Sequence, residues 1–229
     1  MFNFSYIIKF FVPIISVLPT TLLLVLVSAV LGVIIGAVIA IIRVEKIPVL
    51  RQICAVAVSF FRGTPILIQM FVVYYGLPLL LLGVGIDIMR WDKMLFIYIT
   101  FGLNVGAFLS EVFRSSILSV PSSQWDAAAM VGHGKARAYL SVIVPQAAVI
   151  AIPSLSYTFI MLFQDTSLTF AMGVVDVIGK AQLLGGRIFH TMEGYFVAAI
   201  IFITFSILIE KGFALLAKRL NTQGKIFKG

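Results

Sequence analysis

The chain has 229 residues, of which 61% are hydrophobic and 11% charged, with a formal net charge of +8 and a mean hydropathy of +1.13. Soluble domains contain about 45–50% apolar and about 25% charged residues, so this composition excludes a soluble enzyme. The single cysteine, Cys54, excludes an intramolecular disulfide scaffold, and the surplus of Lys and Arg is typical of cytoplasmic loops in a membrane protein rather than of a nucleic-acid partner.

Three stretches without a charged residue are long enough to cross a bilayer. They contain 33 residues after Lys9, 24 after Arg62 and 27 after Arg137, whereas a membrane-spanning helix needs about 20. We predict an all-α integral membrane protein with five transmembrane helices, at about 13–42, 65–82, 94–114, 142–163 and 195–217. Twelve of the 17 Lys and Arg then fall on one side and five on the other. The richer side is expected to be cytoplasmic, which puts the N-terminus outside and the C-terminus in the cytoplasm.

The cytoplasmic connection at 115–141 is too long for a simple turn and carries helix signals of its own. Pro121 and the serines after it are typical of a helix start, and Asp126 would lie near the positive end of the helix dipole. The alanines at 127–129 predict a short, smooth helix that ends at Gly132. Such a helix fits either the groove of another protein or a plain position at the membrane interface.

The same connection resembles a known family. Asp-Ala-Ala at 126–128, then Gly132 and Ile-Val-Pro-Gln at 143–146, resemble the EAA loop of type I ATP-binding cassette (ABC) importer permeases. Two departures are Asp126, where the family usually has Glu, and His133, where an apolar residue is usual.

Three further blocks, in the right order, resemble the polar amino acid branch of that family. They are FRGTP at 61–65, the run from Asn104 to Arg114, and DTSL at 165–168, which Gln164 precedes where Lys is common. The segment 170–182 further resembles the cystine-type members.

The resemblance implies a five-span permease fold, in one domain over 1–229, whose cytoplasmic loop forms a coupling helix. That helix would dock into a separate ABC ATPase subunit, which would hold ATP and Mg. It also implies a second permease subunit, identical or paralogous, an extracellular or periplasmic substrate-binding protein, and a place in the bacterial cytoplasmic membrane. The coupling residues would be Ser123, Asp126, Ala127, Ala128, Gly132 and His133. The substrate would be a polar amino acid, with L-cystine as one candidate.

A transport path is also indicated by the polar residues of the spans. Thr100, Asn104 and Glu111 share one face of the third span, and polar groups inside a bilayer usually face a bundle interior or a watery path. With polar positions in the second and fourth spans, the candidate path residues are Gln69, Asn104, Glu111, Ser154, Thr158 and Asp165. Each has a purely structural alternative: Asn104 could make a helix–helix hydrogen bond, and Glu111 could form a local pair with Arg114.

Catalytic, cofactor and metal sites are not predicted on this chain. There is no Walker-type nucleotide motif, and His133 and His190 are expected on opposite sides of the membrane. The chain is therefore predicted to be no enzyme. Two alternatives stay open: a stand-alone secondary transporter or channel without an ATPase partner, and a scaffold that does not transport.

Overall fold

The structure is a computed structural model, which describes residues 2–223, with side chains through Leu220. Every regular element among these residues is helical. The α-helices are α1 (Phe4–Ile15), α2 (Leu18–Val44), α3 (Leu50–Gly63), α4 (Ile66–Phe71), α5 (Leu77–Leu82), α6 (Lys93–Leu118), α7 (Ser122–Met130), α8 (Lys135–Ala138), α9 (Val144–Asp165), α10 (Val177–Arg187) and α11 (Thr191–Gln223). Two π-helical segments, η1 (Val72–Gly76) and η2 (Tyr139–Ile143), and one 3-10 segment, η3 (Thr166–Met172), interrupt them.

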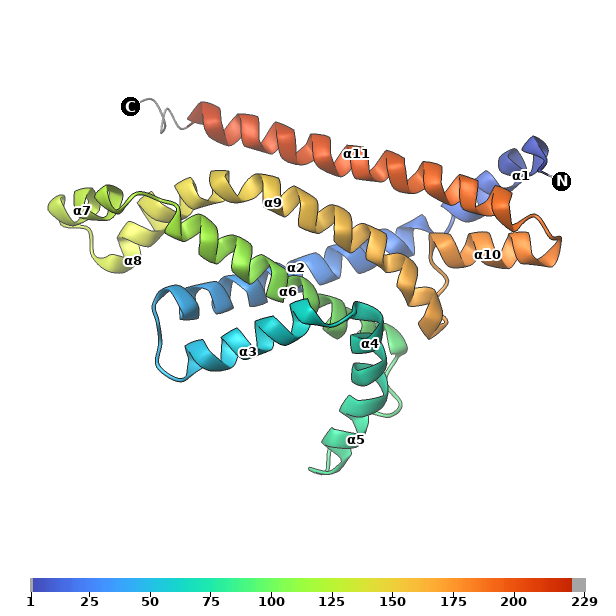
Figure 1. Cartoon of the computed structure of the whole chain (residues 1–229), viewed down its shortest axis with the longest axis horizontal. Coiled ribbons are helices and arrows are strands. Elements are labelled where there is room, and N and C mark those ends of the chain that lie inside the picture. Colours follow the sequence, from blue (N-terminus) through green and yellow to red (C-terminus); the bar gives the residue numbers. More distant parts are fainter. Residues whose placement is uncertain (1, 224–229) are drawn as a thin grey trace.

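Four helical stretches are long and apolar enough to cross a membrane, within the described part of the chain: α2, α6, the stretch Lys135–Met172 and α11. A fifth crossing is possible where α3 and the helix Ile66–Leu82 form a bent pair. The long helices lie roughly along one axis, with α7 at one end and α1 and α10 at the other (Figure 1). The predicted class, an all-α membrane protein, is confirmed.

The closest helix contact is between α2 and α6, and it rests on two glycine pairs. Two glycines lie four residues apart in each helix: Gly32 and Gly36 of α2 pack against Val105 and Leu109 of α6, and Gly102 and Gly106 of α6 pack against Leu31 and Ile35 of α2. A Cβ at Gly32 would lie 2.6 Å from Val105 Cγ1, so the backbones approach more closely than any larger residue would allow. Small residues at this spacing are a common way to pack helices in a bilayer, where the hydrophobic effect does not drive helices together.

The span predicted at 65–82 coincides with the helix Ile66–Leu82, but the sequence did not indicate the helix α3 that precedes it. Helix α3 starts at Leu50 and ends at Gly63. The angle between α3 and the helix Ile66–Leu82 is 112°. Thr64 is extended, with φ −116° and ψ 144°, because a residue before proline avoids the α conformation. Arg51 and Arg62 interrupt the apolar pattern of α3, so the sequence did not reveal this half of the element.

The other predicted boundaries also move, because helices continue past the apolar core of the membrane into its polar surface. The first long helix starts at Leu18 rather than 13, after the separate helix α1. The third and fifth run over Lys93–Leu118 and Thr191–Gln223. The fourth begins at Lys135 and passes Pro145 without a sharp turn. The connection predicted at 115–141 is therefore reduced to 119–134.

The helix α1 packs against the start of α11. The Asn3 backbone N–H donates to Glu193 Oε1 at 2.8 Å, and the Tyr6 ring stacks on His190 with 4.0 Å between centroids. A buried cluster around Phe10, Ile14 and Val197 continues this contact into the membrane region. The N-terminal helix is thereby fixed to the end of the molecule that lies opposite α7 (Figure 1).

Candidate functional site

The predicted coupling residues gather on and next to α7. The helix begins after Pro121 and ends where Gly132 adopts φ +77°, a left-handed conformation that favours glycine. Ser123, Asp126 and Ala127 are exposed, whereas Ala128 is buried against the body of the protein. The outer face of α7 thus consists of short side chains and one carboxylate.

Just past the helix, His133 is half-buried, and its Nδ1 has no hydrogen-bond partner among the described residues. Met130 and Val131 at the tip are 83% and 70% exposed. The end of α7 therefore presents apolar side chains, next to a buried ring nitrogen that has no hydrogen-bond partner among the described residues.

The inner face of α7 is held by aromatic and amide contacts. The Trp125 ring meets Tyr139 edge to face with 4.7 Å between centroids. Gln146 Nε2 of α9 donates to Gln124 Oε1 at 3.1 Å. Beneath them lies an apolar cluster that includes Ile117 and Ile143. Because η2 and α9 supply these contacts, α7 is seated directly on the start of the fourth long helix.

The end of α2 is tied to the same region. Glu45, the residue after α2, accepts hydrogen bonds from the Lys135 ammonium and the Tyr139 hydroxyl. These bonds, first that of Lys135 and then that of Tyr139, hold the pKa of the Glu45 carboxyl below its usual value. The contact joins residues 90 or more positions apart and was not predicted.

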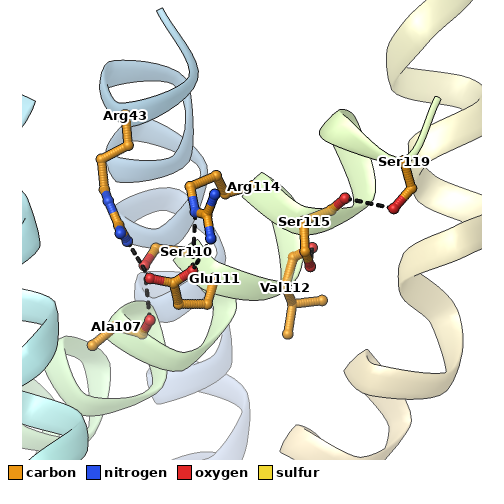
Figure 2. A network of polar contacts seen from close by, with 8 residues as sticks. All are labelled: Arg43, Ala107, Ser110, Glu111, Val112, Arg114, Ser115 and Ser119. Atoms are coloured by element: carbon orange, nitrogen blue, oxygen red, sulfur yellow. Dashed lines mark hydrogen bonds and ion pairs between the residues drawn. The ribbon is translucent and has the colours of Figure 1, made fainter. Parts of the chain in front are cut away.

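A second charged cluster lies on α2 and α6 (Figure 2). Arg114 pairs with Glu111 Oε2 at 2.9 Å, which confirms the predicted local pair. Arg43 of α2 bonds to the other oxygen, Oε1. Side-chain exposure of 15% for Arg43 and 21% for Glu111 shows that the pair is largely shielded from solvent. Arg43 was not among the predicted residues, although its place at the end of the first apolar run was a usable signal.

Gln69 and Asn104 meet at the break between α3 and α4. Asn104 Nδ2 donates to Gln69 Oε1 at 3.0 Å and to the Phe61 carbonyl at 3.2 Å. Gln69 Nε2 lies 2.8 Å from the Phe61 carbonyl and 2.9 Å from that of Thr64. The two amides thus satisfy carbonyl groups at the open end of α3, which otherwise lack intrahelical partners.

Asn104 also lines a small cavity with Thr158 and Asp165. The volume is about 40 Å³, which is close to the share of one water molecule, roughly 30 Å³, and too small for an amino acid. The Thr158 hydroxyl donates to the Ser154 carbonyl at 2.9 Å, which leaves it an acceptor only toward this space. The exposed Ser154 and the charged Glu111 are not among the residues that line it.

Similarity to known proteins agrees with this geometry. The chain matches the family described as "Binding-protein-dependent transport system inner membrane component" over residues 29–222. It is 34% identical over 212 residues to the L-cystine transport system permease protein TcyL of Bacillus subtilis (strain 168), covering 92% of this chain and 89% of that one. The L-cystine transport system permease protein TcyB of the same organism is 41% identical over 145 residues, 63% of this chain and 59% of TcyB. A crystal structure of an amino acid ABC transporter with histidines superposes with a TM-score of 0.82 at 26% identity, covering 96% of this chain and 99% of that one.

The chain therefore belongs to the inner membrane components of binding-protein-dependent transport systems. Within them it is a permease subunit of the amino-acid ABC importers and not their ATPase. This confirms the resemblance drawn from the four sequence blocks, and with it a multi-pass position in the inner membrane. Dependence on a binding protein implies two kinds of partner, an ATPase and a substrate-binding protein.

Proposed function

We propose that the chain, paired with a second permease subunit that is identical or paralogous to it, forms the membrane path of an importer for a polar amino acid. L-cystine is the first candidate, because TcyL and TcyB are both cystine permeases by name. ATP and Mg would be held by the ATPase partner. The Lys- and Arg-rich side, with α7 and the C-terminus, would face the cytoplasm, and the N-terminus would lie outside.

The single observation that carries this proposal is the surface of α7. Its exposed positions up to Ala129 bear short side chains and the Asp126 carboxylate, with the exposed Met130 at its end, while Trp125 anchors the opposite face on Tyr139. A helix held on one side and smooth on the other can dock in a cleft of a second protein and transmit its movement as a rigid body. In this proposal Ser123, Ala127 and the Gly132–His133 turn complete the docking surface, and the buried Ala128 sets the depth of the helix.

The path would run past Gln69, Asn104, Thr158 and Asp165, with Glu111 and Ser154 farther from its narrow point. Neutral hydrogen-bonding groups suit a zwitterion in transit without holding it tightly. In the proposed path the space at Asn104, where the cavity is too small for an amino acid, would have to widen. Movement of the ATPase would then be needed to open it.

Co-purification from membranes in mild detergent is the first test of the assembly. A stable complex with an ATPase subunit is expected, and its composition will show whether the second permease is identical. The same complex in liposomes should hydrolyse ATP faster when a binding protein loaded with cystine is added than with other amino acids. A chain that purifies alone and transports without nucleotide would instead favour a stand-alone transporter.

Variants of α7 test the coupling role with matched controls. Asp126→Lys reverses the charge on the docking face and should abolish stimulated ATPase activity, whereas Asp87→Lys reverses an exposed acid far from it. Gly132→Leu places a side chain where φ is +77°, while Gly134→Leu stands in the same turn with φ −64°. Full stimulation in both test variants would refute the docking surface.

A further inference from the structure

An apolar cavity of about 540 Å³ lies between α2, α6 and α9, with η2 among its walls. Six of its lining residues are alanines: Ala37, Ala40, Ala136, Ala147, Ala148 and Ala151. Larger apolar side chains complete the wall, among them Leu140, which is 74% exposed. A cavity of this size and lining does not hold ordered water, because water needs polar partners, and it therefore suits a hydrocarbon ligand.

A second cavity, of about 780 Å³, adjoins the first through the shared residues Ile117 and Tyr139. It is markedly more polar: Lys46, Lys135, Ser119 and Ser122 are among its lining residues. Lys135 pairs with Glu45 but remains 69% exposed. Lys46 is exposed and has no ion pair or side-chain hydrogen bond recorded within the described residues. With two ammonium groups against one carboxylate, this cavity carries a net positive charge.

The apolar cavity also lies away from the proposed path. Its α6 residues Phe113, Ser116 and Ile117 are turned from Asn104 by about 180°, 120° and 140°, at 100° per residue. This step of the argument rests on the proposed function: if the path and the second permease lie on the Asn104 side, the alanine-lined cavity faces the bilayer. Surrounding lipid is then the occupant available to it.

We propose that the two cavities form one binding site for an anionic glycerophospholipid. An acyl chain lies in the alanine-lined cavity, and the phosphate lies beside Lys46 and Lys135. The order of the two cavities matches a lipid of the cytoplasmic leaflet, because the polar cavity adjoins the loop next to α7 and the apolar one extends into the membrane region. The bound lipid lies against Tyr139, whose ring also meets Trp125 of the coupling helix, and Trp125 itself lines the polar cavity.

The site can be tested by photolabelling of the purified transporter complex in nanodiscs. The probe is phosphatidylglycerol with a diazirine in one acyl chain, and phosphatidylcholine with the same chain is the comparison. Labelled positions are mapped by peptide mass spectrometry. We expect phosphatidylglycerol to label residues 37–41 and 136–155 preferentially, and phosphatidylcholine to label them no more than the exposed face of α11.

Two pairs of variants distinguish a defined site from general lipid contact. Lys46→Gln should weaken phosphatidylglycerol labelling about fivefold, given roughly 1 kcal/mol per basic residue near an anionic lipid, while Lys211→Gln on α11 should not. Ala148→Phe fills the apolar cavity and should abolish the label, while the exposed Ala199→Phe should not. Lys46→Gln lies on the surface, so it keeps the test valid even if Ala148→Phe folds poorly.

Several results would overturn the proposal. These are equal labelling by both lipids, no effect of Lys46→Gln, and a crosslink from Leu140→Cys to a second permease chain, which would mean that protein covers the cavity. Complete competition by free glycerol 3-phosphate would reduce the site to a headgroup pocket. Because labelling is read on the chain itself, it is separable from the proposed function: lost ATPase coupling with intact labelling would refute only the latter.

Discussion

Replacing Gly36 with alanine would test how much the close contact of α2 and α6 contributes to stability. A Cβ there would lie 2.9 Å from Leu109 Cβ and 3.1 Å from both the Gly106 carbonyl oxygen and the Ser110 amide nitrogen. Carbon atoms in contact prefer about 3.5–4.0 Å. Because the obstacles are a Cβ and backbone atoms, no change of rotamer relieves them, and α2 must move away from α6.

The expected cost follows from two opposing effects. Overpacking of this kind destabilises by about 1–3 kcal/mol, whereas alanine gains about 0.8–1 kcal/mol over glycine in helix propensity. Gly212→Ala on α11 provides the control, because a Cβ there meets nothing within 4 Å. The propensity gain is common to both variants, so the difference between them isolates the clash.

The assay is the Tm of the purified complex, measured by gel filtration of heated samples. At about 2–4 °C per kcal/mol for a chain of this size, Gly36→Ala should melt several degrees below Gly212→Ala. Since Arg43 follows two turns after Gly36, the displaced helix should also strain the bond to Glu111. Equal Tm values for Gly36→Ala and Gly212→Ala would refute the view that backbone contact sets the distance between α2 and α6.

Three further variants probe the polar contacts. Glu111→Gln removes the acidic partner of Arg43 and should lower the Tm by several degrees, since hydrogen bonds to charged groups contribute about 1.5–3 kcal/mol; a wild-type Tm would mean that the cluster adds no stability. Asn104→Ala takes the donor from the buried Gln69 Oε1, a loss of about 1–3 kcal/mol, and should reduce both Tm and uptake in proteoliposomes, so unchanged uptake would argue against a place in the path. Glu45→Gln should destabilise by at most about 1 kcal/mol at neutral pH. Because the pKa of Glu45 is lowered in the folded state, that difference is present above the ordinary pKa of 4.5 and is lost as the pH falls through the lower folded value; a difference that does not shrink as the pH is lowered would exclude the carboxylate charge as its cause.

Local signals predicted the local features of this protein. Pro121 and Gly132 bracket α7 closely, because helix starts and left-handed ends depend on a few neighbouring residues. The charge-free runs found the long helices but not their ends, since hydrophobicity marks the hydrocarbon core and helices extend beyond it. The break at Thr64 was readable from Pro65, yet its 112° bend depends on packing that one sequence does not reveal.

The polar contacts between helices were harder to predict. Gln69 and Asn104 were both singled out, but their meeting depends on how α4 and α6 pack. The bonds from Glu45 to Lys135 and from Arg43 to Glu111 join residues 90 and 68 positions apart. A charged residue at the end of an apolar run signals only that it lies near the membrane surface, and many partners satisfy that condition equally well.

Two opposite charges, Arg43 in the last turn of α2 and Glu45 just after it, contact different neighbours. Arg43 forms an ion pair with Glu111 of α6. Glu45 forms an ion pair with Lys135 of α8, next to the contacts that hold α7. The two ion pairs differ in strength because exposure to water weakens an ion pair. The Arg43 side chain is 15% exposed, whereas that of Lys135 is 69% exposed. If α7 and its supporting helices move relative to α2, the ion pair of Glu45 with Lys135 should break before that of Arg43 with Glu111. In the proposed function, α7 would then shift with the fourth long helix while α2 and α6 stay together.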